Sequence, residues 1–391
     1  SLGGVQKVQK EVFPDVPVLI FNDNNCSGQS YIDAANINGT AEIISTDPYP
    51  TATNAYFGMH RALYHVGFSC RVLKDLVPDA RLMVMPQAFI YHGAHGDLAA
   101  MREWASQAMK NGAEHLMWYC SQSASTIFKD YAGMLELSAM VGKMDKIDLP
   151  KATKTLVWYS NFDKWAKRDR VMHPTYSLYA MLYEKVGSNF RFISDTAVED
   201  DAVKLEDYKL MYVPQMTYTT EKIAGKLLDW VKNGGTMVIF DPQFMTWNLD
   251  SSLNKERAVF TGQTGTQAVK TSGNSEVLWN STKLPAAMIA NSPALPGSRF
   301  ASYTVNASGS KVAATYGDNT PAAIERNIGK GKVIYFGIQP FAGSDLVSNS
   351  AAWEKFFAAQ ANSVGEKINL PIRDFLLPDP PKVVNLKHII K

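Results

Sequence analysis

PVLIFND (17–23) begins apolar and ends in polar residues, and three later segments repeat this pattern. They are AEIISTDPYP (41–50), RLMVMPQAF (81–89) and AEHLMWYCSQ (113–122). A helical stretch follows each segment, so the pattern predicts parallel strands that alternate with helices. Four such units make half of a (β/α) barrel, in which the carboxyl ends of the strands carry the active site. We therefore look for functional side chains at those strand ends.

Apolar residues at helical spacing predict the helices of this part of the chain. We expect them at 3–13, at about 54–66, at 98–111 and at about 125–142. In the third of them, Met101, Trp104 and Met109 are predicted to face inward, and Asn111-Gly112 provides a standard helix stop.

A second series of strands and helices predicts an open, mostly parallel, doubly wound sheet. We expect its strands at 155–160, 190–195, 208–215 and 236–243, and its helices at about 174–186 and 219–232. Residues 245–310 are rich in Ser, Thr, Asn, Gly and Pro, and we interpret them as loops and short strands. A hairpin around Gly329-Lys330-Gly331 and a helix at 351–364 complete the series.

A chain of 391 residues is too long for one ordinary core, so two domains are expected. The charged, Pro-containing stretch GKMDKIDLPKAT (142–153) is the predicted boundary. We assign 1–145 to the half barrel and 151–365 to the doubly wound domain. Residues 366–391 form a predicted extended tail, because they contain closely spaced prolines.

Composition excludes several classes of partner. The chain is 46% hydrophobic and 19% charged, with a formal net charge of +2, which is typical of a globular protein. No basic run is interleaved with aromatic residues, so nucleic acid is not an expected partner. A membrane is not expected either, since no apolar run approaches about 18–20 residues. No leader opens the sequence; we leave the compartment open and slightly favour a bacterial periplasmic or secreted location over the cytoplasm.

Two stretches resemble a known family. GAEHLMWYCSQS (112–123) resembles the last barrel strand of clan-A glycoside hydrolases, and 155–243 resembles the glutamine-amidotransferase-like domain that some of them carry. Glycoside hydrolase family 42, the β-galactosidases, is the nearest named relative. The resemblance implies the C-terminal half of a TIM-type barrel, followed by a class I amidotransferase-like domain that is non-catalytic and helps to build a trimer. It also implies a carbohydrate substrate.

The same resemblance predicts an incomplete catalytic pair. If 114–119 is the last barrel strand, the chain contains strands five to eight, whereas the acid/base Glu of the clan follows strand four. The nucleophile position falls at Met85-Pro86-Gln87. Retaining glycosidases need two carboxyl groups about 5–5.5 Å apart. An amide at Gln87 neither forms a glycosyl ester nor acts as a general acid, so the catalytic residues are left unknown.

Several strand-end residues are candidates for binding substrate, each with a structural alternative. Asp47 can bind hydroxyl groups and Tyr49 can stack on a sugar ring, or Asp47 stabilises an Asp-Pro turn. Gln87 contacts substrate or is a satisfied buried amide. Trp118 is a stacking platform or a core aromatic residue. The last two candidates are Asp23 and Asn24, which bind hydroxyl groups or solvate a loop.

No cofactor or metal is expected. His92 and His95 lack a nearby third ligand and are interpreted as a solvated loop. An active amidotransferase needs a nucleophilic cysteine, and no cysteine lies beyond Cys120. In the second domain, the strand ends Asp195, Gln215 and Asp241 can line a crevice. No GxGxxG follows its first strand, so a dinucleotide is not expected.

Three functions compete. The first is a β-galactosidase-like glycoside hydrolase whose chain as given lacks a complete catalytic pair. The second is a non-catalytic carbohydrate-binding or assembly protein with the same folds, and the third is an enzyme of another class. A half barrel has open edges at 17–23 and 114–119, and open edges invite pairing. We therefore expect another segment or subunit to complete it, and a homo-oligomer, either a dimer or a trimer.

Overall fold

The computed structural model describes most of the chain. The described residues are 2–22, 34–50, 63–89, 97–119, 131–145, 147, 149–150, 152–167, 173–264, 269–270, 277–280, 282–284, 302–338 and 351–380. The chain divides into two compact units. Unit 1 comprises Ser1–Lys151 and Pro371–Lys391, and unit 2 comprises Ala152–Leu370. The chain thus leaves unit 1, forms unit 2 and returns.

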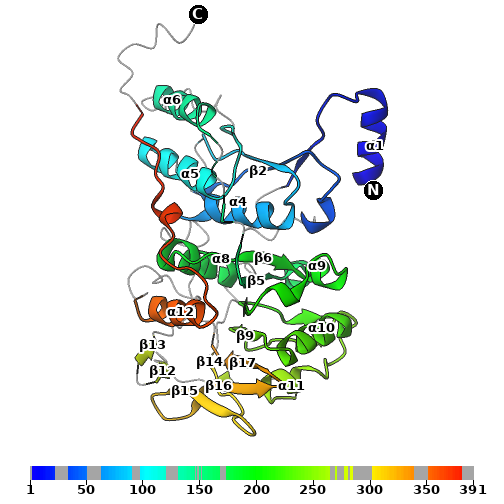
Figure 1. Cartoon of the computed structure of the whole chain (residues 1–391), viewed down its shortest axis with the longest axis vertical. Coiled ribbons are helices and arrows are strands. Elements are labelled where there is room, and N and C mark those ends of the chain that lie inside the picture. The colour runs from blue at the N-terminus through cyan, green and yellow to red at the C-terminus, as the bar shows by residue number, and fades with distance from the viewer. Residues whose placement is uncertain are drawn as a thin grey trace, which may run out of the picture. The chain divides into compact units, whose positions relative to one another are not determined.

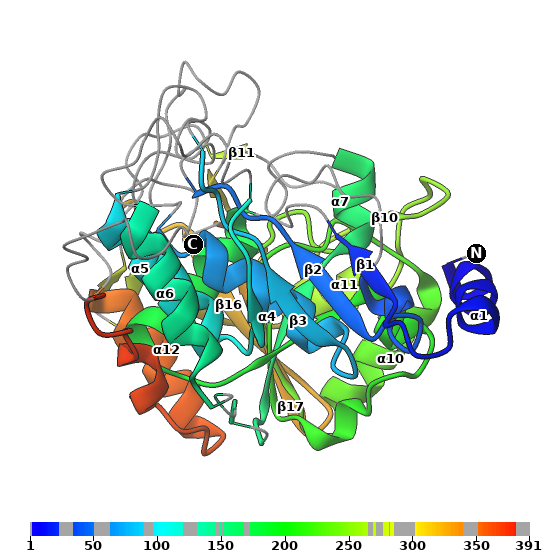
Figure 2. The same cartoon turned by 90° about the horizontal axis from the view of Figure 1, so that it is seen from above.

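Unit 1 contains a parallel sheet of four strands in chain order, β1-β2-β3-β4. Its strands are β1 (Leu19–Phe21), β2 (Ile43–Thr46), β3 (Arg81–Val84) and β4 (His115–Leu116). Its helices are α1 (Leu2–Val12), η1 (Ala34–Ile37), α4 (His65–Leu76), α5 (Leu98–Lys110), α6 (Tyr131–Gly142) and η5 (Pro371–Asp374). Figure 2 shows β1, β2 and β3 side by side, as their register requires. All four predicted strands are present, each shorter than its apolar segment.

Both ends of helix α5 are set by residues that favour helix termini. The Asp97 side chain accepts a hydrogen bond from the backbone N–H of Ala100 and so caps the first turn. Gly112, with a φ of 87°, follows the last turn in the left-handed conformation that glycine tolerates. The predicted inward residues Met101, Trp104 and Met109 are all buried.

One predicted helix of unit 1 differs. Most of the segment 54–66 lies outside the described residues, and the described helix, α4, runs from His65 to Leu76. Val66, Cys70 and Leu73 bury one stripe of α4, with Val77 just beyond its end. This stripe extends well past the predicted end of the helix, because the apolar periodicity continues without a break. The first six residues of the predicted helix 125–142 also lie outside the described part of the chain.

The C-terminal segment of unit 1 packs against α5. Leu377 is fully buried, and its backbone N–H donates to Ser106 Oγ at 3.0 Å. The Lys110 ammonium donates to the Arg373 carbonyl at 2.9 Å, and the Arg102 guanidinium contacts the Leu377 carbonyl. Part of the predicted extended tail is therefore a structural element of unit 1.

Unit 2 is built on a sheet of nine strands in the order β13-β12-β15-β16-β17-β9-β7-β5-β6. These strands are β5 (Thr155–Tyr159), β6 (Arg191–Ser194), β7 (Leu210–Val213), β9 (Thr236–Ile239), β12 (Val277–Trp279), β13 (Thr282–Leu284), β15 (Lys311–Tyr316), β16 (Pro321–Ile328) and β17 (Gly331–Phe336). Short strands outside this sheet are β8 (Tyr218–Thr219), β10 (Trp247–Asn248), β11 (Val269–Lys270) and β14 (Ser302–Tyr303).

Helices cover both faces of this sheet. They are α7 (Asn161–Lys167), α8 (His173–Tyr179), the π-helical η3 (Ala180–Val186), α9 (Asp195–Glu199), η4 (Leu205–Asp207), α10 (Glu221–Lys232), α11 (Arg257–Thr261) and α12 (Ala351–Ser363). Figure 1 shows α8 and α12 on one side of the sheet of unit 2 and α9, α10 and α11 on the other.

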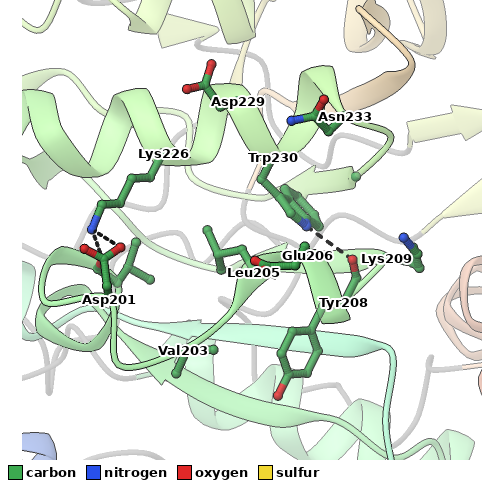
Figure 3. A pocket seen from close by; sticks show the side chains of 12 residues that line it. Asp201, Val203, Leu205, Glu206, Tyr208, Lys209, Lys226, Asp229, Trp230 and Asn233 are labelled. Carbon is green, nitrogen blue, oxygen red and sulfur yellow. Dashed lines mark hydrogen bonds and ion pairs between the residues drawn. The ribbon is translucent and has the colours of Figure 1, made fainter.

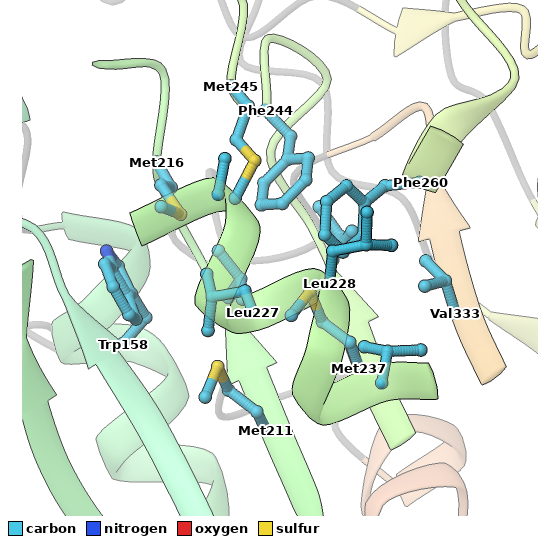
Figure 4. Packing of buried hydrophobic residues seen from close by; sticks show 14 of the residues in the cluster. Trp158, Met211, Met216, Leu227, Leu228, Met237, Phe244, Met245, Phe260 and Val333 are labelled. Atoms are coloured by element: carbon cyan, nitrogen blue, oxygen red, sulfur yellow. The ribbon is translucent and has the colours of Figure 1, made fainter. Parts of the chain in front are cut away.

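The strands of unit 2 carry apolar side chains toward both helix layers, because successive residues of a strand point to opposite faces of the sheet. Met211 of β7 and Met237 of β9 lie in the core cluster beneath α10 (Figure 4). Val213 of β7 belongs to the same cluster. Tyr212, between Met211 and Val213, meets Phe357 of α12 on the other face, with ring centroids 5.3 Å apart. Burial on both faces is why these strands read as continuous apolar runs.

The sheet is mixed rather than mostly parallel. The pairs from β17 to β6 are parallel, as the βα series predicts, and the pairs from β13 to β17 are antiparallel. The predicted hairpin is confirmed by β16 and β17, with Gly329 at a φ of 60° in the turn. In the described part of 245–310, β12 and β13 join the main sheet and α11 packs against it. Their short apolar patches gave too little periodicity to predict this.

None of the described helices is long and apolar enough to cross a lipid bilayer.

Candidate functional site

Three aromatic rings meet at the carboxyl ends of β2, β3 and β4. Tyr49 lies 5.3 Å from Phe89 and 5.4 Å from Tyr119 between ring centroids, and Phe89 lies 5.9 Å from Tyr119. The three strands are neighbours in one parallel sheet, so residues just beyond their ends converge. Tyr119 is 36% exposed, which gives the cluster an accessible apolar face. We call these three residues the aromatic cluster.

Asp47 lies beside the cluster. The Tyr49 hydroxyl donates a hydrogen bond to Asp47 Oδ2, and the Asp47 side chain is almost fully buried. Burial raises the pKa of Tyr49 well above its usual value, and the hydrogen bond to Asp47 and the negative charge of Asp47 raise it further. Tyr49 is therefore a neutral hydrogen-bond donor, and Asp47 is the carboxylate that orients it.

Gln87 is held by the backbone around it. Its Nε2 donates to the Phe89 carbonyl at 2.7 Å, and the side chain is 1% exposed. Its own backbone N–H donates to Pro48 O at 3.3 Å, while Ala88 N–H donates to Tyr119 O at 3.1 Å. The amide thereby fixes the backbone turn that presents Phe89 to the cluster.

Trp118 and the N-terminal candidates are placed differently. The Trp118 indole is buried, and its Nε1 donates to Ser138 Oγ on α6 at 2.9 Å. Successive residues of a strand point to opposite faces, so Trp118 packs toward the helix layer while Tyr119 enters the cluster. Asp23 and Asn24 lie outside the described residues, as do His92 and His95. The structure thus brings Asp47, Tyr49 and Gln87 together and separates Trp118 from them.

Sequence reasoning missed Phe89 and Tyr119. Both follow directly on predicted strand ends, and the rule that strand ends carry the site already pointed there. What the sequence lacked was the strand register. The bridge between Gln87 and Tyr119 shows that these two residues lie opposite each other in the sheet.

In unit 2, three aspartate side chains hydrogen-bond to loops at the carboxyl ends of the parallel strands. Asp195, after β6, accepts the backbone N–H of Asn161 and that of Phe162. Asp241, after β9, accepts the Met216 N–H at 2.8 Å and the Thr217 hydroxyl at 3.1 Å.

The third, Asp163, lies at the start of α7 and accepts N–H bonds from the loop after β7. The predicted crevice residues Asp195 and Asp241 therefore fasten loops to one another, and Gln215 beside them is buried. No metal-binding group of three His, Cys, Asp or Glu side chains occurs within the described ranges.

The arrangement in unit 1 combines an apolar aromatic face with a buried carboxylate, a neutral phenol and an amide. Aromatic faces pack against the apolar faces of flat ligands, while carboxylate and amide oxygens accept hydrogen bonds. Such a set is typical of sites for neutral ligands that have both a C–H face and hydroxyl groups. Among the described residues that directly follow β1, β2, β3 and β4, Asp47 is the only carboxylic acid.

A family model and solved structures match this chain. The model of the β-galactosidase trimerisation domain matches residues 157–359. A search of curated proteins finds no match. A β-galactosidase from the Antarctic haloarchaeon Halorubrum lacusprofundi has a TM-score of 0.71 at 16% identity, over 93% of this chain and 57% of that one.

A catalytic mutant of Gan42B, a GH42 β-galactosidase from G. stearothermophilus, has a TM-score of 0.66 at 14% identity, over 92% of this chain and 55% of that one. An exo-β-1,4-mannosidase from Opitutaceae bacterium strain TAV5 has a TM-score of 0.60 at 10% identity, over 92% of this chain and 68% of that one. These likenesses show the fold. The chain spans little more than half the length of the two β-galactosidases.

Proposed function

Since the chain belongs to the family defined by the β-galactosidase trimerisation domain, we propose that it is a β-galactosidase-like protein of carbohydrate metabolism. Its unit 1 binds a β-galactoside at the carboxyl ends of β2, β3 and β4. The observation that carries this proposal is the aromatic cluster of Tyr49, Phe89 and Tyr119 beside Asp47.

Each residue has a defined role in this binding. The half-exposed ring of Tyr119 stacks on the apolar face of the sugar. Asp47 and Tyr49 form a hydrogen-bonded pair that orients the sugar hydroxyls. Gln87 positions the backbone that presents Phe89. Trp118 supports the site from the helix layer rather than from the ligand side.

We further propose that this strand-end site binds sugar without holding a complete catalytic pair of its own. Retaining hydrolysis needs a carboxylate that attacks the anomeric carbon and a second that transfers a proton. Gln87 stands where the resemblance expects the nucleophile, and its amide is engaged with Phe89 O. Hydrolysis by the usual route then requires a carboxyl group from outside the described strand ends. A non-catalytic carbohydrate-binding protein is the alternative.

The proposed architecture is a C-terminal half barrel followed by an amidotransferase-like domain. Four parallel strands in chain order support the first part, because consecutive neighbours are what a (β/α) barrel requires. Five parallel strands with helices on both faces support the second. We propose that unit 2 assembles the chain into a homo-oligomer, and specifically a trimer, as the matched domain description implies. Sedimentation of a clean monomer would contradict that assembly.

The test is calorimetric titration of the full chain with lactose, with hydrolysis of an aryl β-galactoside measured in parallel. We expect wild-type protein to bind lactose and Tyr119→Ala to bind it at least ten-fold more weakly. Trp165→Ala is the matched control, since Trp165 of unit 2 is equally exposed at 36%. Unchanged affinity in Tyr119→Ala would contradict the proposed site. Hydrolysis of the aryl β-galactoside by the wild-type chain would contradict the incomplete catalytic pair.

A further inference from the structure

Unit 2 contains a cavity of about 310 Å³ at the amino ends of its parallel strands. Lys209 and Gly235 line it, and they directly precede β7 and β9. The aspartates that fasten the loops follow the carboxyl ends of β5, β6 and β9 in the same sheet, so this cavity is separate from that edge. Its volume lies at the lower end of the range for small-molecule sites, about 300–1,000 Å³.

The floor of the cavity is apolar and held in place. Val203, Leu205 and Tyr208 pack against the core cluster and stay partly exposed. Trp230 Nε1 donates to the Tyr208 carbonyl at 3.2 Å (Figure 3), which fixes the plane of the indole. Gly235 lies against that ring, since a Cβ there would come within 2.5 Å of Trp230 Cδ2. An aromatic wall fixed in this way needs no ordering when a ligand binds.

One wall of the cavity is formed by Lys226, whose ammonium group is fully hydrogen-bonded within the protein. The Lys226 ammonium donates to the carbonyl oxygens of Val198 and Glu199 at 2.7 and 2.9 Å, and to Asp201 Oδ1 at 2.7 Å. These bonds use the three hydrogens of the ammonium group. Lys226 therefore holds the loop before η4 in place and has no further hydrogen for an anionic ligand.

The rest of the rim offers donors and acceptors of both kinds. Glu206 and Asp229 accept hydrogen bonds, Lys209 donates them and Asn233 does both. The lining carries three carboxylates and two ammonium groups, so it does not favour an anion. A fixed, partly exposed apolar floor of Val203, Leu205 and Tyr208, with mixed hydrogen-bonding groups around it, suits a neutral ligand that has an apolar face and many hydroxyl groups.

We propose that this cavity is a second carbohydrate site, on unit 2, that takes a neutral mono- or disaccharide. The sugar packs over the partly exposed Tyr208 and Leu205, beside the buried Trp230, and its hydroxyls bond to Glu206, Asp229 and Asn233. This site is independent of the strand-end site in unit 1, because it shares no residue with it.

The experiment titrates lactose into the 391-residue chain carrying Tyr119→Ala, in which the proposed site of unit 1 is weakened. We expect residual binding there, and a further loss of ten-fold or more when Glu206→Gln and Asp229→Asn are added. Both side chains are exposed, so neither change disturbs the core. Glu221→Gln is the control, since Glu221 is an exposed acid of α10 that does not line the cavity.

The outcomes separate the two proposals. If Tyr119→Ala leaves lactose binding intact and the cavity substitutions abolish it, the cavity site stands and the site in unit 1 falls. If the cavity substitutions leave residual binding unchanged, or none is present, the second site is overturned. It is also overturned if these substitutions alter only the oligomeric state in sedimentation, because the cavity then receives a cationic side chain of a second copy.

Discussion

The Asp163 carboxylate accepts the backbone N–H of Thr217 through both of its oxygens, at 2.9 and 3.1 Å. Asp163 follows β5 and Thr217 follows β7, and these strands are neighbours where the chain order of the sheet reverses. Ligands of open α/β sheets bind in the crevice at such a point. In this protein the crevice is bridged by a carboxylate.

We expect Asp163→Ala to destabilise unit 2 strongly. The substitution leaves the buried N–H of Thr217 without its acceptor and removes a bond of 2.8 Å from the Tyr218 N–H. A buried donor left unsatisfied costs about 1–3 kcal/mol. Urea unfolding followed by circular dichroism measures the change. Asp207→Asn, on an exposed residue, serves as the control, and equal midpoints for the two variants would refute the bridging role.

We expect Asp195 to make stability depend on pH. Burial raises the pKa of Asp195 well above its usual value, and the nearby negative charge of Asp163 raises it further. A carboxyl whose folded pKa is raised contributes stability below its unfolded pKa, and this stability is lost as pH rises through the folded value.

The comparison is between the wild type and Asp195→Asn, which keeps the side chain neutral. We expect the urea midpoint of the wild type to fall relative to that of the variant as pH rises above the unfolded pKa, which is about 4. Parallel pH profiles for the two proteins would show that Asp195 does not carry this linkage.

We expect Leu377→Ala to destabilise unit 1. The Leu377 side chain is fully buried, with 0% of its surface accessible to solvent, where the returning segment packs against α5. Truncating a buried leucine costs about 2–5 kcal/mol. Leu376, its neighbour in sequence, is 46% exposed, and Leu376→Ala should change stability by less than about 0.5 kcal/mol. Thermal unfolding of the two variants decides whether the returning segment supports unit 1.

We expect two glycine substitutions to shift stability in opposite directions. Gly235→Ala places a methyl group 2.5 Å from the Trp230 indole, and overpacking of this kind costs about 1–3 kcal/mol. Gly225 lies inside α10, and apart from its chain neighbours and the nearby backbone of its own helix no atom lies within 4 Å of an added Cβ. Gly225→Ala should stabilise by about 0.5–1 kcal/mol, because alanine loses less backbone entropy in a helix. Chemical denaturation of both variants checks the pair, and a stabilising Gly235→Ala would contradict the close packing.

Local sequence patterns predicted many of the strands and helices of both units. Apolar runs that alternate with helical stretches located the parallel strands of both units, and Asn111-Gly112 located the end of α5. The hairpin at Gly329 followed from its turn chemistry. The pattern failed where the apolar segments were short, as in β12 and β13, because two or three residues establish no period.

The sequence by itself determined which residues stand at strand ends, since apolar runs and helix caps depend on neighbours along the chain. Tertiary structure alone decided that Tyr49, Phe89 and Tyr119 converge, that Asp163 bridges to Thr217 and that Trp230 forms the wall of a cavity. Each of these contacts depends on which strands or loops become neighbours and in which register. That choice is made by packing between residues far apart in the chain, and no local pattern records it.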